Sequence, residues 1–220
     1  MIVIATYNKP KLLTDLLDSM KDTVNMDEKI LVVCTDPNQT EMLEFLKELP
    51  TRYEFDITTD VTPYAGYDTG AYIYVSRKYK EDYFIFLQDS ITIKSPEWLN
   101  AFKACRRPNV LTGWVLFPMM WDNTEQIEWV ESKFKPLFFK PVVGLFGPMF
   151  QVERNTLKKI DKKYDLTKFI PTRKIIEQQG MERCWSYLAA HCGMEVTSID
   201  GFFLDWDNKK YINKHFQKRD

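Results

Sequence analysis

The sequence is short of the residues that hold zinc sites and small disulfide-bonded domains together. Its 220 residues include four cysteines and two histidines, and no two cysteines form a CxxC pair. The spacing therefore indicates neither a zinc site nor a disulfide framework, and we expect reduced thiols in an intracellular protein. Cys184 and Cys192 lie near one face of a predicted helix, as buried small apolar groups would.

Long apolar runs are also missing. No stretch approaches the ~20 apolar residues that span a bilayer. The most apolar segment, Leu137–Phe150, is interrupted by Lys140, Pro141 and Pro148. The first apolar run, Ile2–Ala5, has no basic region before it, so no signal peptide is predicted. We expect a soluble, cytoplasmic protein without a transmembrane segment.

An excess of charge of either sign is absent as well. Thirty Lys and Arg nearly balance 31 Asp and Glu, which gives a net charge of −1. This balance argues against a dedicated nucleic-acid binder, although the tail over residues 209–219 is locally basic. With 45% hydrophobic residues and only eight glycines, the chain is long and apolar enough for one α/β domain.

Short apolar strands alternate with amphipathic helices in the first half of the chain. The order β-α-β-α-β-α-β predicts a mostly parallel central sheet with right-handed crossovers, flanked by helices. The predicted strands are Ile2–Ala5, Lys29–Thr35, Tyr53–Asp60 and Tyr83–Leu87. The first predicted helix begins at Pro10, and two further helices cover Met42–Leu49 and Tyr67–Tyr79.

The second half is less regular. Pro118–Val143 shows no clear periodicity and is rich in tryptophan and phenylalanine. On either side, the pattern predicts helices over Pro96–Cys105, Glu153–Ile160 and Ile175–Cys192, and strands over Asn109–Phe117, Leu145–Val152 and Glu195–Ile199.

Polar residues follow three of the predicted strands. They are Thr6, Tyr7 and Asn8, then Asp36, then Gln88, Asp89 and Ser90. Ligands of open parallel sheets bind beyond the carboxyl ends of the strands, so these residues are candidates for one site. The alternative is that they only form turns, and Asp36-Pro37 is an ordinary turn sequence.

The segment Ile2–Pro10, with Leu12, Leu13, Leu16 and Leu17, resembles the opening of GT-A fold glycosyltransferases, especially family-2-like members. Phe84–Ser90 and Pro96–Leu99 look like the metal-binding "DxD" strand of that family and the segment after it. Gly147–Val152 with Asn155–Leu157 resembles its later strand-and-helix unit on the acceptor side, and the helix with Glu182 resembles its acidic catalytic helix. The resemblance implies one GT-A domain over 1–220, with a nucleotide-binding half over about 1–95 and an acceptor-side half over about 96–220.

The resemblance also assigns roles at the nucleotide. Thr6 and Tyr7 would hold the base and ribose, with Asn8 in the same turn, and Asp36 would accept a hydrogen bond from the base. Three further residues, Gly66, Asp68 and Gly70, would lie near the ribose or donor sugar, although Asp68 could simply cap a helix.

A divalent cation, Mn²⁺ or Mg²⁺, is implied at the diphosphate. The usual acidic run has become Gln88-Asp89-Ser90 here, so Asp89 would be the main ligand with Gln88 or Ser90 assisting. A metal-free variant stays open. His215 is at the place of a C-terminal histidine ligand in many relatives, but a surface histidine in a basic tail is the alternative.

Glu182 is the candidate general base for an inverting transfer. The family motif is commonly Glu-Asp, whereas this chain has Met181-Glu182-Arg183. If Glu182 corresponds to the first acid, Arg183 occupies the base position and the role is lost. A solvent-facing helix charge is the alternative, and a retaining enzyme would need no such base.

Several aromatic residues of the irregular middle could contact sugar at an acceptor cleft, although most are expected in the core: Trp114, Trp121, Trp129, Phe134, Phe138 and Phe139. The resemblance implies transfer of a hexose from a nucleoside-diphosphate sugar, UDP foremost, to a hydroxyl of a glycan or small acceptor. Two rivals remain. A nucleotidyltransferase would carry a Gly-rich basic loop after the first strand, and a binding module would explain the altered motifs.

Overall fold

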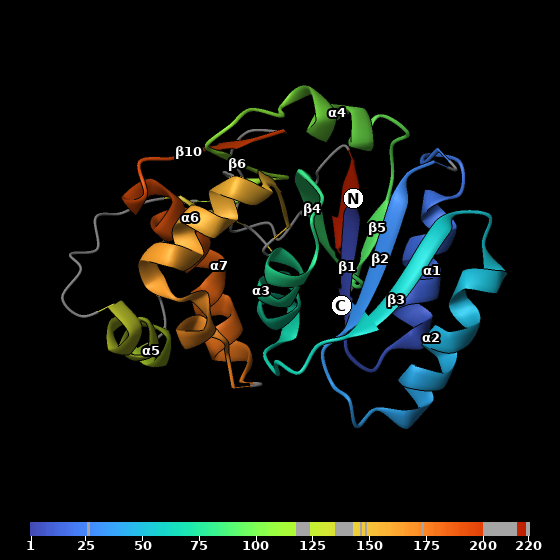
Figure 1. Ribbon diagram of the computed structural model, residues 1–220, viewed down its shortest axis with the longest axis horizontal. Helices are drawn as coiled ribbons and strands as arrows, with labels where there is room; N and C mark the ends of the chain where they lie inside the picture. Colours follow the sequence, from blue (N-terminus) through green and yellow to red (C-terminus); the bar gives the residue numbers. More distant parts are fainter. Residues whose placement is uncertain are drawn as a thin grey trace.

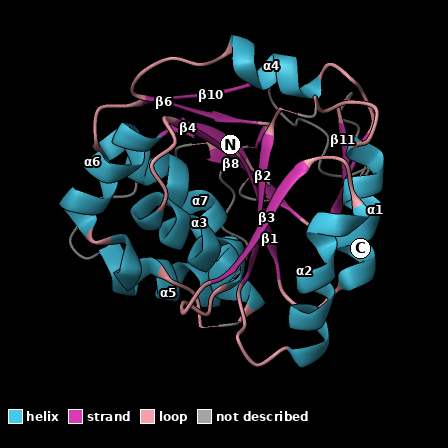
Figure 2. Cartoon of the chain, turned by 45° about the vertical axis from the view of Figure 1, so that its right-hand side comes forward, coloured by secondary structure: helices cyan, strands magenta, loops and turns pink. Residues whose placement is uncertain are grey.

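A computed structural model describes residues 1–25, 27–117, 124–134, 143–145, 147, 149–172, 174–199 and 215–218. A seven-stranded sheet forms the centre, in the order β10-β6-β9-β4-β1-β2-β3, with helices on both faces (Figures 1 and 2). Its strands are β1 (Ile2–Thr6), β2 (Lys29–Cys34), β3 (Asp56–Val61), β4 (Tyr83–Gln88), β6 (Val110–Gly113), β9 (Phe150–Glu153) and β10 (Glu195–Ser198).

Two small antiparallel ribbons and a set of helices complete the described chain. The ribbons pair β5 (Ile91–Ile93) with β11 (Phe216–Lys218), and β7 (Leu116–Phe117) with β8 (Gly144–Leu145). The helices are α1 (Pro10–Met20), α2 (Thr40–Arg52), α3 (Tyr67–Lys78), α4 (Trp98–Ala104), α5 (Thr124–Phe134), α6 (Arg154–Tyr164) and α7 (Ile175–His191), with a 3₁₀ turn at Leu166–Phe169.

The sheet is mostly parallel, as the sequence predicted. β1 pairs in parallel with β2 and β4, β2 with β3, and β6 with β10, whereas β9 runs antiparallel between β4 and β6. Every residue of β1 is buried, because both faces of the strand are covered. Ile2 and Ile4 pack toward α1, α2 and α4, whereas Val3 and Ala5 pack toward α3, α6 and α7.

The middle of the chain differs from the sequence-based expectation. The strands predicted over Asn109–Phe117 and Leu145–Val152 are each divided in two, and α5 lies inside the segment read as irregular. The helical period of α5 is obscured because Gln126 takes a buried position and donates a hydrogen bond to Gln179 of α7 (2.8 Å). A polar side chain thus replaces an apolar one in the packed face of this helix.

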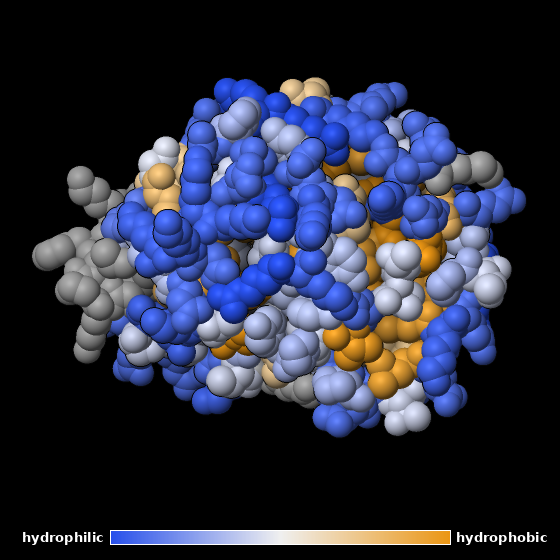
Figure 3. Space-filling view, in the orientation of Figure 1, coloured by the Kyte–Doolittle hydropathy of each residue, from blue (hydrophilic) through white to orange (hydrophobic). Residues whose placement is uncertain are grey.

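Most of the surface in the view of Figure 3 is hydrophilic, with apolar side chains visible between the elements on its right-hand side. In the described ranges, no helix is both long enough and apolar enough to cross a membrane. All four cysteines have free thiols.

Two glycines allow the close approach of backbone at the start of α3. Gly66 has a φ of +112°, and a Cβ there would lie 2.6 Å from the Cγ2 atom of Ile170 and 2.7 Å from the carbonyl oxygen of Pro171. A Cβ on Gly70 would lie 2.6 Å from the carbonyl oxygen of Ala65 and 2.9 Å from that of Tyr64. Backbone carbonyls cannot move aside as side chains do, so both positions require glycine for packing.

We predict that Gly70→Ala destabilises the fold. The substitution usually stabilises a helix by about 1 kcal/mol, but here the clash should lower the free energy of unfolding by about 1–3 kcal/mol. Urea unfolding measures the change. Gly193→Ala is the comparison, because a Cβ there meets no atom within 4 Å and reports only the strain of a φ of +70°. A stabilised Gly70→Ala variant would contradict the packing role.

Candidate functional site

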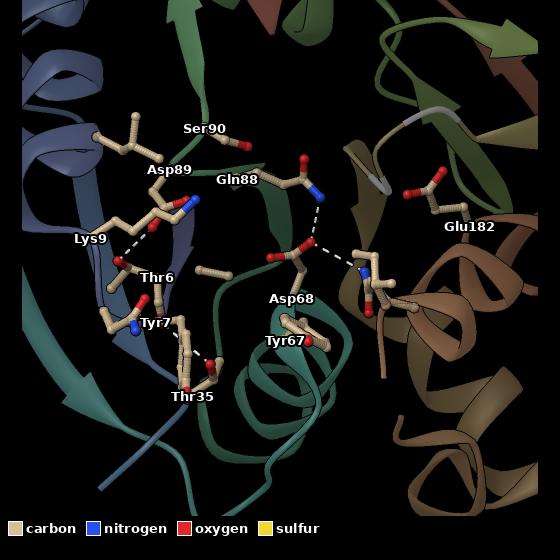
Figure 4. A pocket seen from close by; sticks show the side chains of 15 residues that line it. Thr6, Tyr7, Lys9, Thr35, Tyr67, Asp68, Gln88, Asp89, Ser90 and Glu182 are labelled. Carbon is tan, nitrogen blue, oxygen red and sulfur yellow. Dashed lines mark hydrogen bonds between the residues drawn. The ribbon is translucent and has the colours of Figure 1, made fainter. Parts of the chain in front are cut away.

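A cleft lies at the carboxyl ends of β1, β2 and β4 (Figure 4). The strand register puts Ala5 opposite Gln88 and Thr6 opposite Cys34, so the residues that follow these strands meet at one edge. The cleft is lined by Ala5, Thr6, Tyr7, Asn8, Lys9, Leu12, Thr35, Tyr67, Asp68, Gln88, Asp89, Ser90, Ile175, Gln178 and Glu182.

Asp89 is held against the end of β1. The Thr6 hydroxyl donates a hydrogen bond to the Oδ2 atom of Asp89 (2.7 Å), and the Asp89 amide donates to the carbonyl of Ala5 (3.2 Å). Burial raises the pKa of the Asp89 carboxyl to about 6, although the Thr6 hydrogen bond and the positive charge of Lys9 act in the opposite direction. A carboxylate that is costly to desolvate, yet kept in a cleft, is a candidate for binding a cation.

Asp68 bridges the two halves of the cleft. Its Oδ2 atom accepts hydrogen bonds from the side-chain amides of Gln88 on β4 and Gln178 on α7, the latter at 3.2 Å (Figure 4). Gln178 also accepts a hydrogen bond from Thr69 (3.3 Å). The N-cap residue of helix α3 is Gly66, so Asp68 does not occupy the N-cap position. Gln88 therefore uses its amide to hold Asp68.

Glu182 lies on the opposite wall of the cleft from Asp89 (Figure 4). Arg183, the next residue, is buried and donates a hydrogen bond to the carbonyl of Gln179 (2.9 Å) within α7. Glu182, and not Arg183, therefore lines the cleft, and its role as a general base stays a prediction.

The buried hydroxyl of Tyr72 reports on the charge of this site. Its pKa is raised well above the usual value, first by burial and then by the negative charges of Asp68, Asp89 and Glu182. Three carboxylates from three different elements therefore act on one point beneath the cleft. Such a concentration of negative charge is more favourable with a cationic group bound than without one.

Two tyrosines form one side of the cleft. The rings of Tyr7 and Tyr67 are 6.4 Å apart and meet edge to face at 62°. Tyr67, which the sequence analysis did not single out, has a φ of +50°. This left-handed conformation costs a non-glycine residue on the order of 1–2 kcal/mol. No sequence pattern marks it, because only glycine and asparagine signal positive φ with any regularity.

Three of the predicted nucleotide-binding residues do not line the cleft. Asp36 is buried in its own turn, where one carboxylate oxygen accepts from the Asn38 amide (3.0 Å) and the other from Gln39 (2.9 Å). Asp36 thus has the turn role that the sequence left open, and its contact with a base stays a prediction. Gly66 and Gly70 serve the backbone packing described above. Asn8, by contrast, lies at the rim of the cleft.

His215 is not brought to Asp89. Its carbonyl accepts a hydrogen bond from the Lys94 amide (2.7 Å), and the pairing of β11 with β5 puts Lys218, not His215, beside Ile91. His215 precedes Lys218 by three residues, which places it roughly 10 Å further along the strand from Ile91. His215 is buried next to Phe216, so it is not the surface histidine of the alternative interpretation either. Among the described residues, no group of three His, Cys, Asp or Glu side chains is arranged to hold a metal.

The aromatic residues of the middle segment do not line the cleft where they are described. Trp114 is buried against Phe216 (5.3 Å between ring centres), and Trp129 packs on α7 next to Gly180. Trp121, Phe138, Phe139 and the side chain of Phe134 lie outside the described residues.

No family model and no curated protein matches the sequence. Solved structures do match. GalNAc-T7, solved with UDP, GalNAc and Mn²⁺, is 14% identical with a TM-score of 0.63, over 93% of this chain and 43% of that one. TarS of S. aureus is 12% identical with a TM-score of 0.53, over 99% and 36%. A putative glucose-1-phosphate thymidylyltransferase from Bacillus anthracis, in complex with a sucrose, is 10% identical with a TM-score of 0.50, over 93% and 87%.

The fold is therefore that of the GT-A nucleotide-sugar glycosyltransferases, which nucleotidyltransferases share in outline. The chain spans 43% and 36% of the lengths of the two glycosyltransferases that it matches. At 10–14% identity these similarities show the fold and leave the reaction to be argued from the site.

We predict that Asp89 makes the stability of the protein pH-dependent. Because its folded-state pKa of about 6 exceeds the ordinary 3.8, the folded chain binds this proton more tightly than the unfolded chain. Stability should therefore fall as the pH rises from about 4 to about 6. Asp89→Asn should remove this dependence and should be more stable than the wild type above about pH 6.

Chemical denaturation in EDTA across this pH range measures the effect. Asp56→Asn, at the exposed start of β3, is the matched control. The assignment would be wrong if the two variants had the same pH profile.

Proposed function

We propose that this protein is a glycosyltransferase that moves a hexose from a nucleoside-diphosphate sugar, with UDP as the nucleotide, to a hydroxyl of a glycan or small acceptor. The observation that carries the proposal is the arrangement of carboxylates on opposite walls of one cleft. Asp89, beside the Thr6 hydroxyl, lies at the end of β1 and β4, and Glu182 lies across from it on α7. The wall with Asp89 suits the leaving diphosphate, and the wall with Glu182 suits the acceptor.

The chemistry then follows from the position of each side chain. An acceptor oxygen attacks the anomeric carbon, and the bond from that carbon to the diphosphate oxygen breaks. Glu182 takes the hydroxyl proton as general base, which gives inversion at the anomeric carbon. The nucleoside diphosphate leaves with the negative charge, and Lys9 at the rim of the cleft is positioned to compensate part of it.

The residues fit a divalent cation that takes most of its ligands from the substrate. Asp89 offers one carboxylate, whereas Gln88 is engaged with Asp68. Mg²⁺ and similar ions are commonly bound through one or two carboxylates plus phosphate oxygens. Such an ion would stabilise the charge of the diphosphate as the glycosidic bond breaks. That GalNAc-T7 was solved with UDP and Mn²⁺ supports this assignment.

Nucleotidyl transfer is the second candidate, because the chain covers 87% of a thymidylyltransferase of the same fold. That reaction needs a loop that wraps a triphosphate, commonly rich in glycine. Here the turn after β1 reads Thr6–Pro10 and contains no glycine. A protein that binds nucleotide sugars without turnover is a third outcome that the same assay detects.

The test is nucleotide release from UDP-, GDP- and CMP-sugars with and without Mn²⁺, alongside pyrophosphate release from UTP with sugar 1-phosphates. We expect Mn²⁺-dependent UDP release that Asp89→Ala abolishes. Glu182→Gln should lower the turnover of acceptor-dependent transfer by about 10²–10⁴ while donor affinity stays unchanged. Pyrophosphate release would instead identify a nucleotidyltransferase, and binding without any turnover would identify a binding protein.

Lys9 should contribute to affinity for the diphosphate. We predict that Lys9→Gln weakens UDP binding by about tenfold at low salt and flattens its salt dependence, because a cation facing a diphosphate is lost. Isothermal titration at two salt concentrations measures this. Lys11→Gln is the matched control, since Lys11 pairs with Asp15 on α1 outside the cleft. Equal effects of the two substitutions would mean that only net charge matters.

A further inference from the structure

The exposed side of α6 carries charge of one sign. On its other side, Leu157 and Ile160 are buried and pack in the core with residues of α3 and α7. From position 158 to the end of the helix, every exposed residue is a lysine, and these four form what we call the lysine face: Lys158, Lys159, Lys162 and Lys163. The surface that overlies α6 in the view of Figure 1 is mostly hydrophilic (Figure 3).

The acidic residues of this segment are engaged by α3. Asp161 accepts two hydrogen bonds from the Arg77 guanidinium, both at 2.8 Å, and Asp165 accepts another at 3.1 Å. Residues 154–168 include six basic and two acidic side chains, a net charge of +4. Because the whole chain has a net charge of −1, the other residues carry −5 between them. The lysine face is therefore a positive region on an otherwise acidic protein.

The stability of the helix does not account for all four charges. Lys162 and Lys163 lie in the last turn of α6, where a cation interacts favourably with the helix dipole. Lys158 and Lys159 lie further from that end, and each is four residues from another lysine, a spacing at which like charges repel. In the described part of the chain, neither Lys158 nor Lys162 takes part in a salt bridge. The repulsion is offset when an anionic surface covers the face.

A layer of anionic lipid fits the lysine face better than a protein or a nucleic acid does. Lysine is depleted at protein–protein interfaces, and among the described residues α6 exposes no large apolar side chain that could form the buried centre of one. Arginine, which makes paired hydrogen bonds to phosphates and base edges, is missing from the face. Lysine acts as a point charge, so a row of lysines suits the diffuse charge of lipid head groups.

Contact at the lysine face would leave the cleft open. Among the described residues that line the cleft, none belongs to α6. The helix is nevertheless connected to the start of α3, because Ile170, which follows the 3₁₀ turn after α6, lies against Gly66. A bilayer at this face would therefore lie beside the layer that forms one wall of the cleft without covering its lining.

We propose that the lysine face docks this protein on an anionic membrane surface, by electrostatic attraction of its four lysines to the lipid head groups. This inference goes beyond the proposed function and does not depend on it. Because the attraction acts between exposed charges, it should weaken as salt shortens the Debye length, from about 30 Å at 0.01 M to about 10 Å at 0.1 M.

The test is co-sedimentation of the full chain with phosphatidylcholine vesicles, with and without about 30% phosphatidylserine, at low and high NaCl. We expect binding to the anionic vesicles alone, and a loss of at least about tenfold in affinity at high salt. Each lysine near such a surface contributes about fivefold, so Lys158→Gln with Lys162→Gln should weaken binding by about 25-fold at low salt. Substitution of all four lysines by glutamine should abolish it.

The matched control lowers the net charge by the same amount at exposed positions of other elements. It replaces four lysines by glutamine: Lys11, Lys29, Lys47 and Lys94. This variant should bind anionic vesicles nearly as the wild type does. An equal loss in the two fourfold variants would show that net charge alone is responsible and would overturn the proposal.

The double variant also protects the test against a folding defect. Lys159 donates a hydrogen bond to Asn109, and Lys163 donates one to the carbonyl of His191. If the fourfold variant melts lower than the wild type because these bonds are lost, the double variant, which keeps them, decides the outcome.

A second measurement distinguishes lipid from nucleic acid. Fluorescence anisotropy with single-stranded and duplex oligonucleotides, at the same low salt, should show weaker binding than the anionic vesicles do. Tighter binding to an oligonucleotide that the fourfold lysine variant loses would assign the face to nucleic acid and overturn the proposal. Failure of the wild type to bind anionic vesicles at low salt would also overturn it. Nucleotide release in the absence of vesicles tests the proposed function separately.

Discussion

The parallel pairing of β1 with β4 determines where the polar groups of the cleft lie. With Ala5 opposite Gln88, the two strands end together and the chain can connect Thr6 to Asp89 by a 2.7 Å hydrogen bond. A slip of one residue would reverse the face of every side chain in β4 and remove Asp89 from Thr6. The register is secured because both strands are buried on both faces, so each alternative would expose or misplace apolar side chains.

Gln88 is best understood through the charge of its neighbours. Asp68 and Asp89 already line the cleft, and an acid at position 88 would bring another negative charge against Asp68. The amide avoids that repulsion and donates the hydrogen bond that Asp68 accepts, as Gln178 does from α7. The consequence is a set of hydrogen bonds, from two amides to one carboxylate, that ties β4 and α7 to the first turn of α3. The glutamine at the end of β4 is thus coupled to the placement of a carboxylate from another element.

The sequence was informative where one physical signal dominated. Continuous apolar runs marked β1 and β4, and strand direction alone implied that Thr6 and Asp89 would share an edge. The sequence was uninformative where contacts between distant segments determine the position of a residue. The pairing of Phe216 with Ile93 joins segments more than 120 residues apart, and it carries His215 away from Asp89. The buried Gln126 hid α5, and the hydrogen bonds that hold Asp36 in its own turn could not be derived from the sequence.

Three features that oppose folding occur together in the cleft. Burial makes the charge of Asp89 unfavourable, a left-handed backbone strains Tyr67, and Ile175 leaves apolar surface in water. Each would be relieved by a simple substitution, namely Asp89→Asn, Tyr67→Gly or Ile175→Ser. A ligand that carries a cation and an apolar face would offset the costs at Asp89 and Ile175. The ligand of the proposed function, a nucleotide sugar with its metal ion, has these properties.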